Sequence, residues 1–369
     1  MNEHTIVTAF YNIREMEENH VSNRKVEDFL ELAKNFILQL PYPLVIYIDT
    51  SSGADSIYEF IQQNRPYPEK TLIVRESFKD TYFYKDIERI AELQKTYPIY
   101  NAILQHETPN YIVLNNNKFW WLEQTISKNP FSSERFLWMD FSINHVAKNP
   151  ETIHTWFSSI PKKIKQMCIN PLVETNDYKE IFHIIHHHYA GGLFSGNAEY
   201  LLKYSDAFKK TTQKIYDEQW YQIDEAVMTI VHNENPEWFD DFYGDYNGII
   251  MNYNEPLDYN EPWKSWSCIY RGGDKCINHS NYDNAQKLLD YIEREITNQA
   301  NPIFINFQLC YFINNSLICN WYTNNKKIKK SVIDLINREI QKNNQHIKNI
   351  VQTNPEIERY ENKSEILSI

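Results

Sequence analysis

Short apolar runs alternate with amphipathic segments of helical length through the first 75 residues. The runs 5–10, 44–48 and 71–74 are rich in apolar and β-branched side chains, as buried strands are. Between them, residues 26–40 carry apolar side chains at three- and four-residue spacing, and residues 55–63 predict a second helix. A β-α-β-α-β order favours parallel neighbouring strands joined by right-handed crossovers. The chain is therefore expected to begin as an α/β fold with a mostly parallel sheet.

A fourth apolar run lies within Glu134–His145, ERFLWMDFSINH. Its residues 136–139 have no polar face, which is typical of a strand covered on both sides in the middle of a sheet. The run ends on Asp140, and the run at 44–48 likewise ends on Asp49. Open α/β sheets bind ligands at the carboxyl ends of their strands, so both carboxylates are candidates for a binding site. The alternative is that Asp140 only caps the following turn, a common role of aspartate.

The rest of the chain predicts more helices than strands. Helices are expected over 82–97, 109–128, 150–158, 282–295 and 326–343, and strands over 163–169 and near 317–321. Residues 254–284 lack periodicity and predict a loop. The tail beyond Thr353 is expected to be loosely ordered.

Charge and glycine content exclude two common kinds of nucleotide or nucleic-acid site. The formal net charge of −12 argues against a protein that binds nucleic acid, which normally presents a basic face. With only 8 glycines, the chain contains neither a G-x-G-x-x-G fingerprint nor a Walker loop. A nucleotide diphosphate bound at this sheet would therefore need a cation, such as a metal ion, to neutralise it.

Cysteine usage and hydropathy indicate the compartment. The five cysteines are odd in number and show no C-x-x-C spacing, which favours reduced thiols over a disulfide framework or a zinc site. The segment MNEHTIVTAFYNI has no basic region followed by a long apolar core, and no apolar run approaches the ~20 residues of a membrane span. We therefore expect a soluble, cytoplasmic protein without a signal peptide or transmembrane segment.

A segment rich in histidine and glycine, HIIHHHYAGGLFSGNAEY, lies near the middle of the chain. Three of the 8 glycines fall within six residues, which predicts either a tight turn or a close approach of a ligand to the backbone. The histidines at 183, 186, 187 and 188 suggest a zinc site, but no H-E-x-x-H motif is present, and a strand with His186 and His188 on one face is an alternative. Asn197 is expected to cap the next helix.

Two further polar features have both a chemical and a plain structural interpretation. Lys118 lies in a predicted helix just before three aromatic residues, where it either reaches a phosphate or is simply solvated. Asp224 and Glu225 open an apolar helix. Two acids in a first helical turn are favoured by the helix dipole without any catalytic role.

Five segments carry a resemblance to a known family. VTAFYNI, NNKFWWLEQTISKNPFSSERFLWMDFSINH, GGLFSGN, DEAVMTIVHNENPEWF and FYGDY occur in this order between Thr5 and Tyr253. The chain resembles the HtrL/YibB-type family of nucleotide-diphospho-sugar transferases with a GT-A fold. The resemblance implies a GT-A-like (Rossmann-like) α/β domain over residues 1–255, with a mixed, mostly parallel sheet flanked by helices. A mostly helical C-terminal extension packed on this domain is expected over residues 256–369.

The same resemblance implies an activity and its site. A hexosyltransferase-like glycosyltransferase would move a sugar from a nucleotide-diphosphate sugar, with a UDP-sugar favoured, to a glycan or protein acceptor, assisted by Mn²⁺ or Mg²⁺. Asp140 and Ser142 take the place of the metal-binding D-x-D motif, and Asp224 or Glu225 that of the catalytic carboxylate. The residues implied to hold the nucleotide sugar are Thr8, Ala9, Phe10, Tyr11, Asp49, Lys118, Gly191, Gly192, Ser195 and Gly196.

One departure from the family pattern leaves a second hypothesis open. Ser142 stands where D-x-D has an acid, so Asp140 is the firm metal ligand, and Asp245 and His279 are candidates for a second. Mg²⁺ usually keeps several waters, so a hydroxyl or a water can complete its shell. The alternative is a catalytically inactive GT-A-like protein that serves as a binding or scaffold protein. A phosphate-ester hydrolase would show more acids clustered at strand ends.

Overall fold

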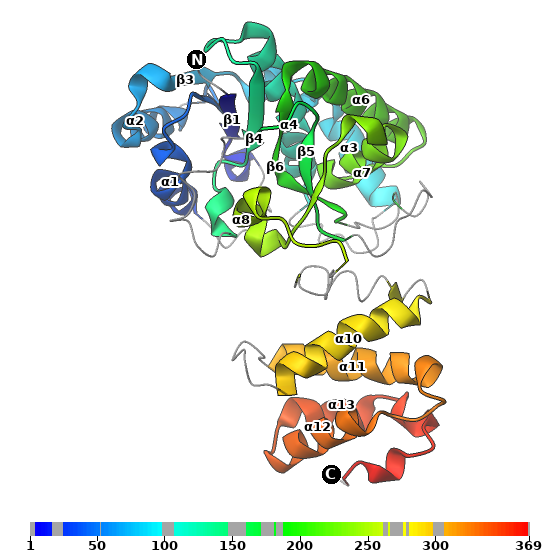
Figure 1. Ribbon diagram of the computed structural model, residues 1–369. Helices are drawn as coiled ribbons and strands as arrows, with labels where there is room; N and C mark the ends of the chain where they lie inside the picture. Colours follow the sequence, from blue (N-terminus) through cyan, green and yellow to red (C-terminus); the bar gives the residue numbers. More distant parts are fainter. Residues whose placement is uncertain are drawn as a thin grey trace. The chain divides into compact units, whose positions relative to one another are not determined.

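The computed structural model describes residues 4–16, 25–51, 53–97, 107–146, 160–170, 181, 187–260, 265, 276–277, 280–297 and 306–367 (Figure 1). They belong to two compact units. The first comprises residues 1–169 and 174–258, and the second comprises residues 170–173 and 259–369. The first unit holds the whole β-sheet, whereas the described helices after residue 280 belong to the second.

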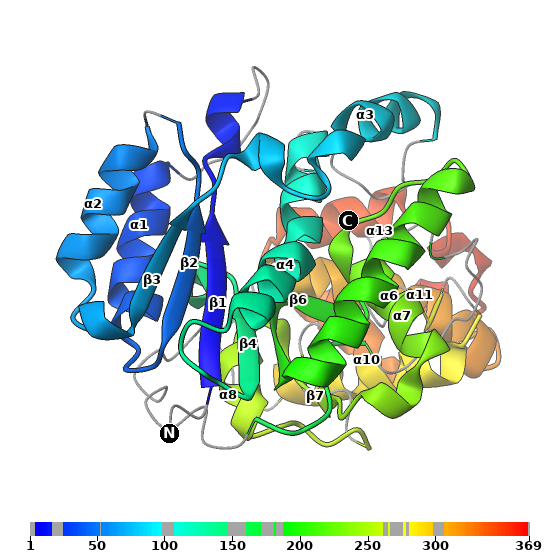
Figure 2. The same ribbon diagram turned by 90° about the horizontal axis from the view of Figure 1, so that it is seen from above.

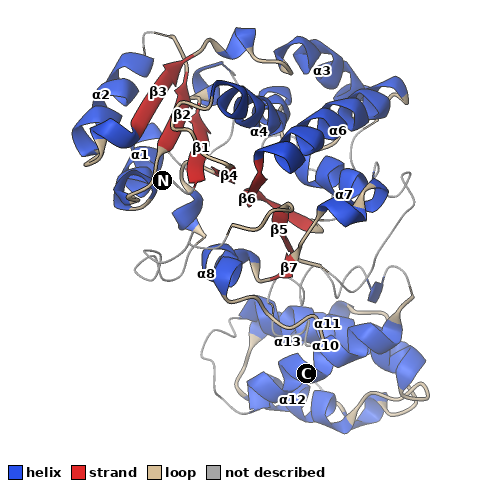
Figure 3. Cartoon of the chain, turned by 45° about the horizontal axis from the view of Figure 1, so that its top comes forward, coloured by secondary structure: helices blue, strands red, loops and turns tan. Residues whose placement is uncertain are grey.

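A seven-stranded sheet forms the centre of the first unit, in the order β3-β2-β1-β4-β6-β5-β7 (Figure 3). Its strands are β1 (His4–Phe10), β2 (Leu44–Ile48), β3 (Thr71–Arg75), β4 (Arg135–Met139), β5 (Lys165–Cys168), β6 (Tyr189–Asn197) and β7 (Phe242–Tyr243). The pairs β1–β2, β2–β3, β1–β4 and β5–β7 are parallel, while β6 runs antiparallel to both β4 and β5. The predicted mixed, mostly parallel α/β sheet is confirmed.

Strand β4 occupies the middle of the sheet, as its uninterrupted apolar run predicted. Phe136 and Trp138 belong to the hydrophobic cluster on one face, and Leu137 and Met139 belong to the cluster on the other. All four side chains are buried. The alternation of side chains along a strand is thus satisfied by two apolar layers rather than by one core and one solvated face.

Helices cover both faces of this sheet (Figure 2). They are α1 (Val26–Asn35), α2 (Ala54–Asn64), α3 (Ile87–Thr96), α4 (Pro109–Lys128), α6 (Ala198–Asp217), α7 (Asp224–Glu234) and α8 (Ile249–Asn254). Residues of α3, α4, α6 and α7 share one cluster with Phe136, whereas residues of α1, α2 and α8 share the other with Leu137. The face under α4 is the one that concerns function.

Two expectations about local structure in this unit were wrong. The helix expected over 26–40 ends at Asn35, and a 3₁₀ turn follows at Ile37–Gln39, because Phe36 leaves the helical conformation with φ −141°. The tight turn, one of the two alternatives for the glycine-rich segment, was wrong, because this segment forms strand β6 and no glycine that the structure describes has a positive φ. The glycines serve close approach instead, since a Cβ at Gly191 would collide with the Asp224 carboxylate. Asn197 caps α6 as predicted, accepting a hydrogen bond from the Tyr200 N–H at 2.9 Å.

The second unit is helical, which confirms the predicted C-terminal helices. Its helices are α10 (Tyr282–Thr297), α11 (Asn306–Thr323), α12 (Lys330–Gln341) and α13 (Gln345–Thr353). The strand expected near 317–321 was wrong, because this stretch lies inside α11. Buried residues there recur at helical three- and four-residue spacing, at positions 312, 313, 316, 317, 319 and 320. A short apolar run alone does not separate a buried helix from a strand.

The segment after Thr353 makes specific contacts within the second unit. Asn362 exchanges hydrogen bonds with the backbone of Ile328 at 2.9 and 3.0 Å. Ile357 and Tyr360 are buried. The helix expected over 150–158 and the residues His183, His186 and His279 lie outside the described residues. Among the helices that the structure describes, none combines the length and apolar character needed to cross a lipid bilayer.

Candidate active site

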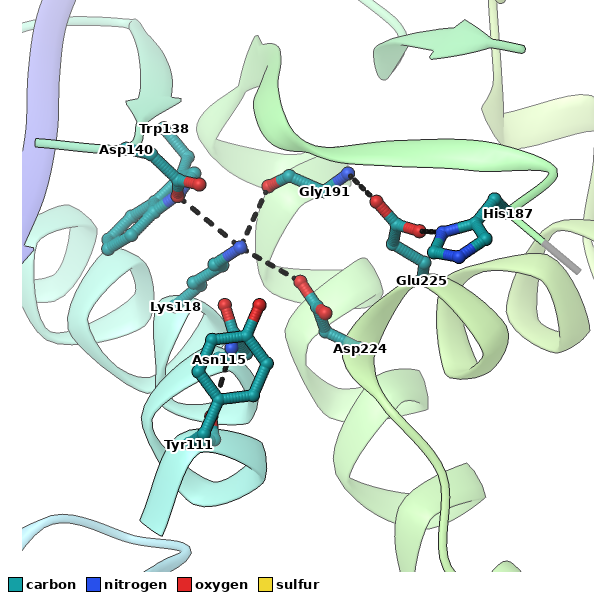
Figure 4. A network of polar contacts seen from close by, with 9 residues as sticks. All are labelled: Tyr111, Asn115, Lys118, Trp138, Asp140, His187, Gly191, Asp224 and Glu225. Atoms are coloured by element: carbon teal, nitrogen blue, oxygen red, sulfur yellow. Dashed lines mark hydrogen bonds and ion pairs between the residues drawn. The ribbon is translucent and has the colours of Figure 1, made fainter. Parts of the chain in front are cut away.

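A buried lysine lies at the centre of a polar cluster on the α4 side of the sheet (Figure 4). Lys118 Nζ is 2.9 Å from Asp224 Oδ2, 3.3 Å from Asp140 Oδ1 and 3.2 Å from the carbonyl oxygen of Gly191. Its side chain is only 7% exposed. One ammonium group therefore joins two carboxylates and a strand backbone away from water.

Four separate segments bring these groups together. Lys118 lies on α4, Asp140 directly follows β4, Gly191 belongs to β6, and Asp224 is the first residue of α7. Antiparallel pairing of Met139 with Leu193 places the start of β6 beside the end of β4. The Asp140 N–H donates to the carbonyl oxygen of Gly192 at 2.9 Å, which extends this pairing by one residue. The cluster thus forms where the carboxyl end of β4 meets the amino end of β6.

Burial divides the two carboxylates into different roles. The Asp224 side chain is 6% exposed, whereas that of Asp140 is 39% exposed. Burial alone would lower the pKa of Lys118, but Asp140 and Asp224 outweigh it and raise this pKa above its usual range. Burial raises the pKa of Asp224, and the Lys118 charge opposes that rise. Asp140 is therefore the member of the cluster that an added ligand can reach.

The Asp140 carboxylate is held in one orientation. The indole Nε1–H of Trp138 donates to Asp140 Oδ1 at 2.9 Å, and the same oxygen faces Lys118. The other oxygen, Oδ2, lies on the side of Gly192, where an added Cβ would come within 3.3 Å of it. Oδ1 is thus the anchored oxygen and Oδ2 the oxygen available to a ligand.

A pair formed by a histidine and a carboxylate adjoins the Lys118 cluster through Gly191. Glu225 Oε2 is 2.5 Å from His187 Nδ1, and Glu225 Oε1 accepts the N–H of Gly191 at 3.3 Å. The carbonyl of Gly191 accepts from Lys118 on the other side. Figure 4 shows Gly191 between Lys118 and Glu225, bonded to the first through its carbonyl oxygen and to the second through its N–H.

Tyr111 is a further member of the cluster that the sequence did not single out. It lies on α4 seven residues before Lys118, and residues seven apart share a helix face. The residue as a whole is 39% exposed, but desolvation around its phenol, followed by the charge of Asp224, raises the pKa of that group, whereas the Lys118 charge lowers it. This i, i+7 spacing is the signal that could have identified Tyr111. His187 and Trp138 were present in the sequence segments already considered, but no pattern indicated their partners.

The residues predicted to bind the nucleotide sugar at the end of β1 lie on both faces of the sheet. Tyr11 lies on the α4 side, stacked on Trp121 at 5.0 Å between ring centroids, and its hydroxyl donates to the Glu76 carbonyl at 3.2 Å. Ala9 packs on the same side. Phe10 belongs to the cluster on the opposite face, and Thr8 is fully buried.

Asp49 and Glu76 follow the carboxyl ends of β2 and β3. Asp49 Oδ1 accepts the N–H of Phe78 at 3.1 Å, and the Trp121 indole donates to Glu76 Oε2 at 3.0 Å. Glu76 was not among the predicted site residues, although it lies two positions after the strand predicted over 71–74. Its burial raises the pKa of its carboxyl group.

Ser195 and Gly196 lie away from the cluster, farther along β6. Four residues separate Gly192 from Gly196, which amounts to roughly 13 Å of extended strand. Ser195 Oγ is 2.5 Å from the Tyr253 hydroxyl in the buried layer of the opposite face, and Gly196 pairs with Phe136. The structure therefore brings Gly191 and Gly192 to Asp140 but does not bring Ser195 and Gly196.

The described residues offer few side chains that could bind a divalent metal ion at this site. Within the described ranges, no three or more His, Cys, Asp or Glu side chains group in a way that could hold a metal ion. Ser142 is buried, and its carbonyl accepts the N–H of His145 at 3.1 Å. Asp245 accepts the N–H of Asn247 at 3.2 Å, the turn chemistry that its sequence context allowed. Asp140 would therefore contribute one ligand atom, its carboxylate oxygen Oδ2, to a metal ion bound at this site.

Comparisons with known proteins give a family match. The family model described as "Bacterial protein of unknown function (HtrL_YibB)" matches residues 2–253. A search of curated proteins found no match. The three solved structures described next are similar over about two thirds of this chain.

The apo form of mouse xyloside xylosyltransferase 1 is 11% identical, covers 66% of this chain and 85% of its own, and has a TM-score of 0.36. The galactosyltransferase LgtC in complex with donor and acceptor sugar analogs is 10% identical, with 65% and 73% coverage and a TM-score of 0.35. The 4-diphosphocytidyl-2C-methyl-D-erythritol synthase of Anaerococcus prevotii DSM 20548 is 10% identical, with 69% and 95% coverage and a TM-score of 0.35. These TM-scores are too low to support a function.

Proposed function

The chain belongs to the HtrL_YibB family, and we propose that it is a glycosyltransferase that uses a nucleotide-diphosphate sugar, with a UDP-sugar as the favoured donor. The observation that carries the proposal is the Lys118 cluster at the carboxyl end of β4. It places one ligand-accessible carboxylate, Asp140, at the edge where open α/β sheets bind nucleotides. The acceptor is a glycan or a protein hydroxyl group.

The reaction requires charge neutralisation at one end and proton removal at the other. The acceptor oxygen forms a bond to the anomeric carbon, and the bond from that carbon to the diphosphate oxygen breaks. The nucleoside diphosphate leaves with the electron pair, and the acceptor hydroxyl loses its proton. A divalent cation held by Asp140 Oδ2 would supply Lewis-acid stabilisation of the leaving diphosphate.

The residues of the cluster keep Asp140 ready for this task. Lys118 lies 3.3 Å from Asp140 Oδ1, and the Trp138 indole donates to the same oxygen, so that the two groups hold the carboxylate in place. Asp224 balances the Lys118 charge from the buried side. We therefore assign Asp224 to positioning and place the acceptor side at Glu225.

A second function is favoured by one specific observation. Ser142 stands two residues after Asp140 where the family motif has an acid, and its carbonyl is engaged by His145. A protein that keeps Asp140 but lacks a second acid could bind a nucleotide sugar without transferring it. This alternative is a binding or scaffold protein with the same ligand.

Binding and turnover separate the two proposals. Thermal unfolding of the full chain is measured with UDP, GDP and a panel of their sugars, in the presence of Mn²⁺, Mg²⁺ or EDTA. Release of free nucleotide from each sugar donor is then measured. The transferase proposal expects a raised Tm with at least one nucleotide sugar and slow release of its nucleotide, because water can replace the acceptor. A raised Tm without release after glycan and protein acceptors are added supports the scaffold. No rise in Tm and no release with any donor would refute both.

A further inference from the structure

His187 and Glu225 form a hydrogen-bonded pair that Gly191 links to the Lys118 cluster. The side chains of His187 and Glu225 are 29% and 13% exposed. An ionised carboxylate only accepts hydrogen bonds, so the ring nitrogen that faces Glu225, Nδ1, is the one that carries the proton. In the neutral ring the basic lone pair is then at Nε2. The pair therefore fixes which histidine nitrogen can accept a proton.

Glu225 is itself held from two sides. It is the second residue of α7, and its Oε1 accepts the N–H of Gly191 while its Oε2 faces His187. Gly191 also accepts from Lys118 through its carbonyl oxygen. Gly191 therefore lies between a base anchored here and Lys118, one of the groups that orient Asp140 (Figure 4).

The backbone of His187 adds an independent observation. Its φ of +47° lies in the left-handed region, which is unfavourable for a residue with a side chain. Such outliers persist where the surrounding structure over-determines them, and they cluster at functional sites. The residue lies two positions before β6 begins, so this conformation sets the direction in which the imidazole leaves the chain.

We infer that His187 is the general base for the acceptor and that Glu225 is its positioning residue. The inference rests on the proposed glycosyltransferase function and names a role within it. As the acceptor oxygen bonds to the anomeric carbon and the diphosphate leaves, the hydroxyl proton passes to His187 Nε2. The resulting imidazolium is paired with the Glu225 carboxylate. Histidine is the side chain most often used for this task.

The tautomer of His187 tests the pair without any substrate. In ¹⁵N-histidine NMR spectra of the full chain, the His187 signals are assigned by their loss in His187→Gln. The neutral ring is expected to carry its proton on Nδ1, and Glu225→Ala is expected to shift it toward the Nε2–H form. The exposed Glu237 supplies the matched control Glu237→Ala, which is expected to leave the signal unchanged. A wild-type ring protonated on Nε2 would overturn the inference.

Turnover tests the catalytic role. With the donor identified by nucleotide release, His187→Gln is expected to lower kcat by about 10²–10⁴-fold at unchanged donor KM. The acid limb of the pH–rate profile should disappear in this variant. His187→Gly suits the positive φ and leaves space for a base, so added imidazole should restore part of kcat.

The two failures are distinguishable. A wild-type enzyme that turns over a donor, with a His187→Gln profile like its own and no imidazole rescue of His187→Gly, refutes the base but leaves the transferase. A wild-type chain that turns over no donor removes both the transferase and the base, whatever the tautomer of His187.

Discussion

Lys118 Nζ and Asp224 Oδ2 lie 2.9 Å apart, although 106 residues separate the two side chains in sequence. Their contact joins the middle of α4 to the first residue of α7 beneath strand β6. It exists only because Gly191, which lies directly against the Asp224 carboxylate, has no side chain. The candidate active site is organised around this buried ion pair.

Removal of the lysine charge is expected to destabilise the fold. Lys118→Met leaves the Asp224 carboxylate buried without a counter-ion, which typically costs about 3–5 kcal/mol. Urea unfolding followed by circular dichroism measures the loss. Lys128→Met, at the exposed end of the same helix, is the control and should change stability by less than ~0.5 kcal/mol. The double variant Lys118→Met/Asp224→Asn should recover part of the loss, and a double variant no more stable than Lys118→Met would contradict the pairing.

Neutralisation of Asp140 is expected to remove metal-dependent donor binding while the fold is kept. Asp140→Asn preserves shape, and the side chain is 39% exposed, so unfolding should shift little. The rise in Tm with nucleotide and Mn²⁺ should disappear, because the ligand-accessible carboxylate oxygen is gone. Asp245→Asn is the control, since that acid serves a turn. Equal thermal shifts for Asp140→Asn and the wild type would remove Asp140 from the binding site.

Two adjacent glycines should respond differently to a methyl group. In Gly191→Ala the new Cβ collides with Asp224 Oδ2, so the ion pair must shift and stability should fall by about 1–3 kcal/mol. In Gly192→Ala the Cβ comes within 3.3 Å of Asp140 Oδ2, which should weaken donor binding with a smaller change in stability. Thermal unfolding with and without nucleotide sugar measures both effects. If both variants lose the same stability and show the same rise in Tm with nucleotide sugar, the separate roles of Gly191 and Gly192 are contradicted.

Stability should fall in mild acid because of a buried histidine. Burial, and then the charge of Arg135, lower the pKa of His4 from 6.5 to about 4. The unfolded chain therefore binds the proton first, and stability present above pH 6.5 is lost as the pH falls toward 4. At pH 5 this amounts to roughly 2 kcal/mol relative to pH 7. His4→Phe keeps an aromatic ring against Tyr42, whose centroid lies 4.4 Å from that of His4, and should lose less stability between the two pH values. Urea unfolding at pH 7 and pH 5 measures both proteins. If the wild type and His4→Phe lose the same stability between these pH values, His4 is excluded as the cause.

Local patterns were sufficient for much of the fold. The β2 run at 44–48 and the α4 helix at 109–128 have the predicted bounds, because each has an uninterrupted pattern and a residue that ends or begins it. Pro109 begins α4 at a position where its missing N–H costs nothing. The α11 helix was partly mistaken for a strand, because its apolar residues surround it and leave no amphipathic period.

The candidate site was predicted only in part. Asp140 was predicted from the end of an apolar run, since a strand end is a local property. Asp224 and Lys118 were both named, but their mutual contact was not predicted, because spacing along a helix says nothing about a partner 106 residues away. The glycines of β6 were noticed for their number, yet their purpose depends on which carboxylates lie against them.

The sequence by itself determined the alternation of strands and helices, the central buried strand and the position of Asp140 at its end. These features follow from apolar periodicity and helix boundaries, which act over a few residues. Only the tertiary structure decided that β6 runs antiparallel beside β4, that Lys118 lies between Asp140 and Asp224, and that His187 faces Glu225. Burial sets the charge balance of such groups, and burial is a property of the packed chain rather than of any segment.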